Sequence, residues 1–520
     1  MEYNQPSEIV KDLTFGDQAS QKIMSGVDKL ANAVKSTLGA SGKCVIYEDA
    51  LGKPVITKDG VTVAESVVLH DPVENMGATL IKEAAKNTVK EAGDGTTTST
   101  VLAHSLLKKS IDALDYSTSI RELQQAFSEG VDLVSDYLDK NKIEVDNEML
   151  TDVAIISTNN DFALGNIIAN AYKQVGKNGV VLMEESETEE TYFDIVDGVQ
   201  FDSGLKSQHL TTNEEKDKAE LENPYILIVA SPIPNIRKIQ AVLEHVIKQK
   251  RSLLIVATVE QQPMAALLTN KVKGNIKVNI VDLPGFGPTK RDTLEDLASL
   301  TGSTIIDEQL GDDLDLIQPE VLGSALKSVT DDNSTVLTIG DVPEEAKERV
   351  ESVENKIKNE KNPFIKKKLE QRLAMLSGSV GIVKVGGNSK VELKEKKDRV
   401  EDAIYAVKAA LQEGIVPGGG VALLNAAQKL KPKNTAEQIF QKAIIAPFST
   451  ILQNAGIEVP NDFKYRKGWG INVMTGKPVN MIKAGIIDPV LVTKTALKNA
   501  VSVVSTIISA DCIISNKRVE

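Results

Sequence analysis

The sequence is poor in the residues that stabilise small secreted domains. Its 520 residues include only two cysteines, Cys44 and Cys512, which excludes a disulfide framework and makes a reducing compartment the expected one. The four histidines are scattered, without the spacing of metal ligands. Aromatic residues make up 4% of the chain, which disfavours a surface that stacks nucleic-acid bases.

Charge and hydropathy exclude further classes of protein. The net charge of −13 argues against a nucleic-acid partner, because phosphate binding needs a basic face. No apolar run approaches the roughly 18 residues of a membrane helix, and the N-terminal residues lack the basic and apolar segments of a secretory signal. We therefore expect a cytoplasmic, multidomain globular protein that binds neither nucleic acid nor membrane.

The stretch from Gly93 to Thr98 is the main candidate for a binding site in the sequence. Two glycines flank Asp94, three threonines follow, and apolar residues then recur at helical spacing, which predicts a tight turn opening a helix. The N-terminus of a helix suits a phosphate, and Asp94 would tolerate that phosphate if Mg²⁺ lay between them. The alternative is that Asp94 and the threonines only cap the helix.

Two further glycine-rich turns, at 39–42 and 418–420, and two further acids, Asp59 and Asp402, complete the candidate set. We expect Asp59 in the turn of a hairpin, between strands at 54–57 and 61–63, and Asp402 on a helix beginning near residue 398. A nucleotide hydrolase needs backbone donors for phosphates, an acid for Mg²⁺ and a carboxylate to orient water. The residues at 39–43 do not have the spacing of a Walker motif.

The remaining patterns divide the chain. Amphipathic spacing predicts a helix over 22–38, and residues 73–140 are expected to be helices interrupted at Asp94. Apolar runs at 225–229, 252–256 and 277–281 alternate with helical patterns, which predicts a separate α/β domain. A charged stretch at 344–376 predicts a helical hairpin that breaks near 362–363.

Several of these motifs together resemble the signature set of group I chaperonins, the GroEL-type family. Their order and spacing match that family over nearly the whole chain. The motifs are Thr37-Leu38-Gly39, Ile56-Thr57-Lys58-Asp59-Gly60-Val61, Gly93-Asp94-Gly95-Thr96-Thr97-Thr98, Lys394-Glu395-Lys396-Lys397 with Arg399-Val400-Glu401-Asp402-Ala403, and Gly418-Gly419-Gly420-Val421-Ala422-Leu423.

The resemblance implies a multidomain α+β fold with three domains. A mostly helical equatorial domain would take residues 1–140 and 413–520 and bind ATP. A small α/β hinge domain would take 141–196 and 381–412. An α/β-sandwich apical domain would take 197–380 and bind polypeptide.

The resemblance also implies roles for individual residues. Asp94 would bind Mg²⁺, and Asp402 would activate water with the assistance of Asp59. The residues implied to bind ATP are Thr37, Leu38, Gly39, Lys58, Asp94, Gly95, Thr96, Thr97, Thr98, Gly419, Asn472 and Asp488. Those implied to hold non-native polypeptide are Leu205, Leu210, Ile239, Leu243, Met264 and Leu268, for which packing in the core is the alternative interpretation.

The implied partners are non-native polypeptides, a GroES-type co-chaperonin and further copies of the chain in a heptameric ring. Ser449 and Tyr116 differ from the residues usual at ring-to-ring contacts, so the hypothesis is that a single ring is populated in place of a double one. The apical face is more polar than usual at His209, Gln240 and Thr269.

The motifs and the resemblance leave three candidate functions. The favoured one is a folding machine driven by ATP. A scaffold that holds clients without productive cycling is the second possibility, favoured by the more polar apical face. A small-molecule kinase or ATPase is disfavoured, because no feature of the sequence indicates a dedicated pocket for a small substrate.

Overall fold

The computed structural model describes residues 10–516 apart from 50, 115–117, 177–178, 214–216, 285–288, 341–342, 459–465 and most of 360–377. Its contacts separate two compact units. The first unit comprises Met1–Asn170, Glu185–Thr191 and Val385–Glu520, and the second comprises Ala171–Glu184 and Tyr192–Lys384. The expected class, a multidomain fold of helices and sheets, is confirmed, while the three-domain division and its boundaries stay a prediction.

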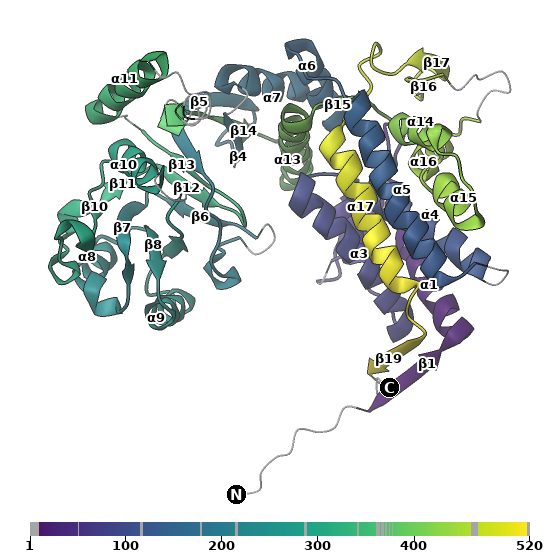
Figure 1. The fold of residues 1–520 in the computed structure, drawn as a ribbon, viewed down its shortest axis with the longest axis horizontal. Coiled ribbons are helices and arrows are strands. Elements are labelled where there is room, and N and C mark those ends of the chain that lie inside the picture. Colours follow the sequence, from purple (N-terminus) through teal and green to yellow (C-terminus); the bar gives the residue numbers. More distant parts are fainter. Residues whose placement is uncertain are drawn as a thin grey trace, which may run out of the picture. The chain divides into compact units, whose positions relative to one another are not determined.

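The first unit is built on a bundle of long helices drawn from both ends of the chain (Figure 1). In α1 the residues Ile23, Val27, Leu30 and Val34 are buried at helical spacing, as the sequence predicts. The C-terminal helix α17 packs against α3, α4 and α5. The bundle helices are α1 (Gly16–Lys35), α3 (Pro72–Ala92), α4 (Thr96–Leu114), α5 (Ile120–Asn141) and α17 (Val490–Ile507).

Shorter elements complete the first unit, except that the last part of α7, from Ala171, belongs to the second unit. The two ends of the described chain pair as antiparallel strands, β1 with β19. The helices are α2 (Gly60–Ser66), α6 (Asn147–Ser157), α7 (Phe162–Val175), α13 (Lys390–Glu413), α14 (Val421–Lys429), α15 (Thr435–Ala443) and α16 (Ala446–Asn454). The strands are β1 (Lys11–Phe15), β2 (Val45–Glu48), β3 (Pro54–Thr57), β15 (Ile415–Pro417), β16 (Trp469–Asn472), β17 (Lys477–Asn480), β18 (Ile487–Pro489) and β19 (Cys512–Asn516).

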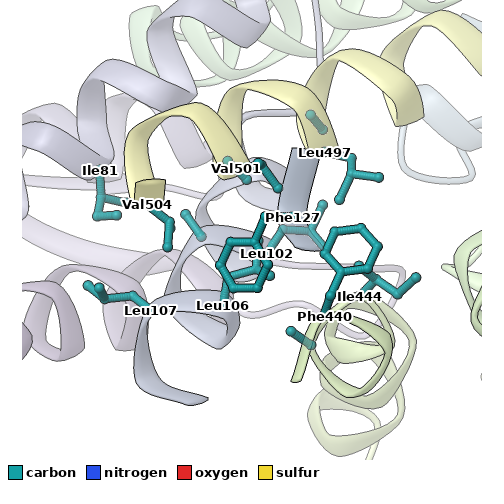
Figure 2. Close-up of a cluster of buried hydrophobic side chains, with 14 of the residues drawn as sticks. Ile81, Leu102, Leu106, Leu107, Phe127, Phe440, Ile444, Leu497, Val501 and Val504 are labelled. Carbon is teal, nitrogen blue, oxygen red and sulfur yellow. The ribbon is translucent and has the colours of Figure 1, made fainter. Parts of the chain in front are cut away.

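The core of the first unit is apolar and includes aromatic rings (Figure 2). Phe127 of α5 and Phe440 of α15 are fully buried, with ring centroids 5.9 Å apart. Helix α17 is long and apolar enough to cross a membrane, but 61% of it is buried inside the protein. Its apolar side chains, among them Leu497, Val501 and Val504, belong to this core.

Truncation of Phe127 to alanine is expected to lower the free energy of unfolding of the first unit by about 3–5 kcal/mol. The ring is fully buried, so its removal leaves a cavity beside Phe440. Urea unfolding followed by circular dichroism measures the loss. Leu133→Ala on the same helix, at a side chain that is 58% exposed, is the control and should change stability by less than about 0.5 kcal/mol. Equal losses in the two variants would contradict the assignment of the core.

The second unit contains the α/β region expected from the sequence. Strands β7 (Tyr225–Ile233), β8 (Leu253–Val259) and β9 (Val278–Val281) run parallel, with β10 (Ile305–Ile306) beside β7. The three predicted apolar runs are therefore confirmed as strands, and their residues are almost all buried, as in sheets covered on both faces. The intervening helices are α8 (Gln240–Gln249), α9 (Gln261–Val272) and α10 (Thr289–Thr301).

A second, six-stranded sheet follows the order β4-β14-β5-β13-β12-β6. These strands are β4 (Val180–Glu185), β5 (Tyr192–Phe201), β6 (Ala219–Glu222), β12 (Lys327–Thr330), β13 (Thr335–Thr338) and β14 (Ser379–Val385). Helix α11 (Glu344–Asn359), strand β11 (Gly323–Ser324) and short 3-10 turns complete the unit as described. The break predicted near 362–363 lies outside the described residues.

The predicted hairpin about Asp59 and Gly60 is wrong. Strands β2 and β3 pair around residues 49–53, and residues 61–63 are helical. The Asp59 carboxylate accepts the backbone N–H groups of Val61 and Thr62, at 3.0 and 2.7 Å, so it caps α2. The helix predicted over 22–38 runs from Gly16 to Lys35, and the helix predicted from residue 398 begins at Lys390.

Candidate functional site

A cavity of about 510 Å³ lies within the first unit. Its volume falls within the range of ligand pockets, roughly 300–1,000 Å³. The three glycine-rich turns line it together with parts of α6, α13 and the strands β16 and β18. It brings together Asp59, Asp402 and every residue that the sequence suggested for ATP, which are Thr37, Leu38, Gly39, Lys58, Asp94, Gly95, Thr96, Thr97, Thr98, Gly419, Asn472 and Asp488.

The Asp94 turn has the geometry that its glycines permit. Gly93 ends α3 in the left-handed region at φ 76°, Gly95 follows at φ 98°, and α4 begins at Thr96. The N–H of Gly95 donates to the Asp94 carboxylate. A tight turn opening a helix, predicted from the sequence, is therefore confirmed.

The cap of α2 lies against the start of α4. A Cβ atom on Gly60 would come within 2.2 Å of the Thr97 hydroxyl, so glycine permits this approach. Asp59 accepts a hydrogen bond of 2.6 Å from the Thr62 hydroxyl as well as the two backbone donors of its helix. Those three bonds fix the direction of the Asp59 carboxylate at the cavity wall.

A second carboxylate is held by the turn at 418–420. Strand β15 pairs with β18, which places Asp488 beside Gly418. The backbone N–H groups of Gly419 and Gly420, both in the left-handed region, donate to the Asp488 carboxylate. The resemblance implied that Gly419 and Asp488 bind the same nucleotide, and the structure adds that backbone N–H groups of this turn hold the carboxylate.

The carboxyls of the cavity repel one another. Burial raises the pKa of Asp94, and burial together with the nearby Asp94 raises the pKa of Asp488 to about 6. Burial, Asp94 and Asp59 raise the pKa of Asp402 well above its usual range. Each of these side chains is half-buried and lines the cavity.

Two cations line the same cavity. Lys58 donates to the side-chain oxygen of Asn159 at 2.9 Å, and burial lowers its pKa. Arg399 forms ion pairs with Glu395 at 2.7 Å and with Asp161 at 3.5 Å. Acids outnumber these cations in the lining, which makes the site suitable for a bound cation.

Mg²⁺ fits this donor set. It takes one or two carboxylates and completes its shell with phosphate oxygens and water. In the described part of the chain no group of three or more His, Cys, Asp or Glu residues could hold a metal by itself. Asp94, beside the threonine hydroxyls at the start of α4, is the carboxylate best placed to share an ion with a phosphate.

The raised pKa of Asp488 predicts a pH dependence of the nucleotide-free protein. The folded protein keeps this proton up to about pH 6, whereas the unfolded chain loses it near pH 4, so stability falls as the pH rises through that window. We expect Asp488→Asn to be more stable than the wild type by about 1–3 kcal/mol at pH 7, with the difference closing as the pH falls towards 4. Urea unfolding between pH 4 and 8 measures this, and a difference that widens on acidification would contradict it.

The six residues suggested for polypeptide binding divide into two groups. Leu210 and Ile239 are fully buried in the core around β7–β9, as the packing interpretation expected. Leu205, Leu243, Met264 and Leu268 are partly buried and pack against that core. Only the second group therefore offers surface in this structure.

Sequence reasoning missed the contribution of α6 to the cavity. Asp152, Ile155, Ile156 and Asn159 all line it. The segment has no glycine-rich turn and no recognised motif, so its place at the cavity follows only from the packing of α6 against α13 and β18.

Comparison with known proteins gives two findings. The model of the TCP-1/cpn60 chaperonin family matches residues 30–518, nearly the whole chain. A crystal structure of the chaperonin gp146 from the bacteriophage EL 2 (Pseudomonas aeruginosa), in the presence of ATP-BeFx, is similar to this chain. The TM-score is 0.69 and the identity 21%, over 97% of this chain and 99% of that one. A second crystal form of gp146 gives a TM-score of 0.65 at the same identity and coverage.

Proposed function

Because the chain belongs to the TCP-1/cpn60 chaperonin family, as a divergent member of the GroEL type, we propose that it is an ATP-dependent chaperonin. It would bind non-native polypeptides in a ring cavity and promote their folding through a cycle of ATP binding and hydrolysis. The observation that carries the proposal is the cavity that collects three glycine-rich turns, the start of α4 and several carboxyls, among them Asp59, Asp94 and Asp402. The gp146 crystals, obtained with ATP-BeFx, support a nucleotide as the ligand.

In this proposal the phosphates lie at the start of α4. The backbone of Gly95 and the hydroxyls of Thr96, Thr97 and Thr98 bind them, aided by the positive end of the helix dipole. Mg²⁺, held by Asp94, would supply charge neutralisation between the phosphates. Lys58, which lines the same cavity, would add positive charge.

Asp402 is the proposed general base, with Asp59 assisting. A base works best when its pKa is near the working pH, and burial together with repulsion from Asp94 and Asp59 raises the pKa of Asp402 in that direction. Asp402 orients the attacking water and accepts its proton. Asp59 assists from the cap of α2, where its three hydrogen bonds with Val61 and Thr62 fix its carboxylate at the cavity wall. Neutralising Asp94 would lower the pKa of Asp402 and leave it ionised to act as a base.

The remaining candidates would surround the nucleoside. Thr37, Leu38 and Gly39 come from the turn after α1. Gly419 comes from the turn at 418–420, Asn472 from β16 and Asp488 from β18. Apolar side chains of the lining, such as Ile471 and Ile486, provide walls for a purine ring.

Polypeptide binding is proposed for the second unit. Leu205, Leu243, Met264 and Leu268 offer partly exposed apolar surface, and unfolded chains present apolar side chains without a defined shape. Leu210 and Ile239 would contribute only after a rearrangement of the surrounding core. The proposed partners are non-native polypeptides, a GroES-type co-chaperonin and further copies of the chain in a heptameric ring, in the cytoplasm.

The domain division implied by the resemblance is part of the proposal. The equatorial part (1–140 and 413–520) would bind ATP, the hinge part (141–196 and 381–412) would carry Asp402, and the apical part (197–380) would bind clients. Ser449 is exposed on α16, while Tyr116, its counterpart in the single-ring hypothesis, lies outside the described residues.

A scaffold without productive cycling is the second candidate. The observation that favours it is the polar character of the helices next to the partly exposed leucines. On α8 the exposed Gln240 donates to Glu244 at 2.7 Å, and on α9 Thr269 is exposed. Such side chains weaken an apolar docking face.

The test combines native mass with client refolding. A particle of seven or fourteen subunits, seen by native mass spectrometry with and without ATP and Mg²⁺, is expected and separates one ring from two. Refolding of a denatured test enzyme should then require hydrolysable ATP. A monomer at all concentrations would overturn the ring, and ATP hydrolysis without refolding would favour the scaffold.

A further inference from the structure

We propose that Asp152 of α6 recognises the nucleoside part of the bound nucleotide, accepting a hydrogen bond from an N–H or O–H donor of that nucleoside. The inference rests on the proposed function, because it concerns the same cavity. It adds a specificity-determining residue from a helix that none of the recognised motifs includes. The shared ligand chemistry is a neutral donor, either the exocyclic amino group of the base or a ribose hydroxyl.

The first observation is the place of Asp152 in the cavity. The residue lines it together with Ile155 and Ile156, which lie one turn further along α6. Its carboxyl packs over Gly485: a Cβ atom built on that glycine would lie 3.0 Å from the carboxyl carbon and one oxygen and 3.1 Å from the other. Gly485 lies in the loop before β18, in the left-handed region at φ 68°, and a side chain at this position would crowd the carboxyl.

The second observation is the absence of a protein partner. Among the described residues, Asp152 has no hydrogen bond and no ion pair, although it is half-buried. Burial raises its pKa, and Glu148 and Asp146 raise it further. No described protein group donates to this carboxyl, so its acceptor oxygens are open to a ligand in the cavity. A ligand that brings a donor into the cavity would satisfy them.

The third observation places this carboxyl at the nucleoside end. The phosphate end of the cavity is defined by Asp94 and the start of α4. Asp152 instead touches the loop that continues into Ile486, which packs with Val473 against the apolar cluster around Ile471 and Met481. An apolar wall suits a purine ring and is unsuitable for a triphosphate. Asp152 therefore lies where the base and the ribose would be.

This arrangement has a consequence for selectivity. An ionised carboxyl accepts from the amino group of adenine and repels the carbonyl oxygen that guanine and hypoxanthine carry at the same position. If the donor is a ribose hydroxyl, the carboxyl discriminates against the deoxy analogue. A site built to accept a ligand donor rejects an analogue that lacks it, because a buried polar group is then left unpaired.

The experiment compares the full-length wild type with Asp152→Asn and Asp152→Ala in the binding of four nucleotides. Isothermal titration at pH 8 with Mg²⁺ measures the affinities for ATP, ITP, 2′-deoxy-ATP and 3′-deoxy-ATP. We expect the wild type to bind at least one analogue about tenfold or more weakly than ATP, since a hydrogen bond to a charged group is worth about that factor. Asp152→Ala should reduce that ratio to about threefold or less, and Asp152→Asn, which keeps a neutral acceptor oxygen, should reduce it by a smaller factor. The analogue affected identifies the donor: ITP indicates the base, and a deoxy analogue indicates the ribose.

The matched control is Glu148→Gln, which changes an exposed carboxylate of the same helix outside the cavity lining. Since Glu148 raises the pKa of Asp152, this control should leave the ratios at pH 8 unchanged but should lower the pH at which discrimination is lost. Unchanged ratios in both Asp152 variants, with ATP still bound, would overturn this inference alone. Absence of ATP binding by the wild type would instead overturn the proposed function. Circular dichroism confirms that each variant is folded.

Discussion

Replacement of Asp402 by alanine is expected to lower steady-state ATP hydrolysis by about 100-fold or more, which is the usual contribution of a general base. Nucleotide affinity should be unchanged or higher, because the substitution removes a half-buried carboxyl that faces the same cavity as Asp59 and Asp94. Phosphate release in the steady state measures the rate. Binding of ATP in the presence of Mg²⁺, on the timescale before hydrolysis, measures the affinity.

Two further variants make the result specific to Asp402. Asp402→Asn keeps the shape of the side chain and removes only its basicity, so it should lose about as much activity as alanine. Glu401→Gln changes the adjacent carboxylate, which does not line the cavity, and should keep the rate within about threefold. A rate in Asp402→Asn close to that of the wild type would assign the base to another residue.

Replacement of Asp94 by alanine is expected to produce the largest change in nucleotide binding. Asp94 is the proposed ligand of Mg²⁺, and a bound cation stabilises phosphate charge by several kcal/mol. The Mg²⁺-dependent part of the affinity for ATP should therefore fall by about 100-fold or more, and hydrolysis should be lost with it. Titration of ATP at a series of Mg²⁺ concentrations measures this dependence.

The pKa values of the neighbouring carboxyls provide a second, independent test of the role of Asp94. Its charge raises the pKa values of both Asp402 and Asp488, so its removal should lower them. The pH dependence of unfolding attributed to Asp488 should then move to lower pH in Asp94→Ala. Retention of the wild-type Mg²⁺ dependence in this variant would assign the metal to another carboxyl, and an unchanged pH dependence would show that the acids do not interact.

The sequence by itself determined several of the elements and the residue types that line the candidate site. Helical spacing of Ile23, Val27, Leu30 and Val34 identified a bundle helix, because burial of one face needs that period. Continuous apolar runs identified the parallel strands β7, β8 and β9, which are buried on both faces. The glycine turns were visible because few other residues adopt a left-handed backbone, and each of them lines the cavity.

The tertiary structure decided what depends on packing between distant segments. Alternation of Val61 and Val63 predicted a strand, but Asp59 caps a helix there, since its carboxylate satisfies two N–H groups that a turn would leave open. Leu210 and Ile239 have the same apolar character as Leu243, and only the surrounding core determines that they are buried. The raised pKa values and the position of Asp152 likewise arise from neighbours that the chain brings together only when it folds.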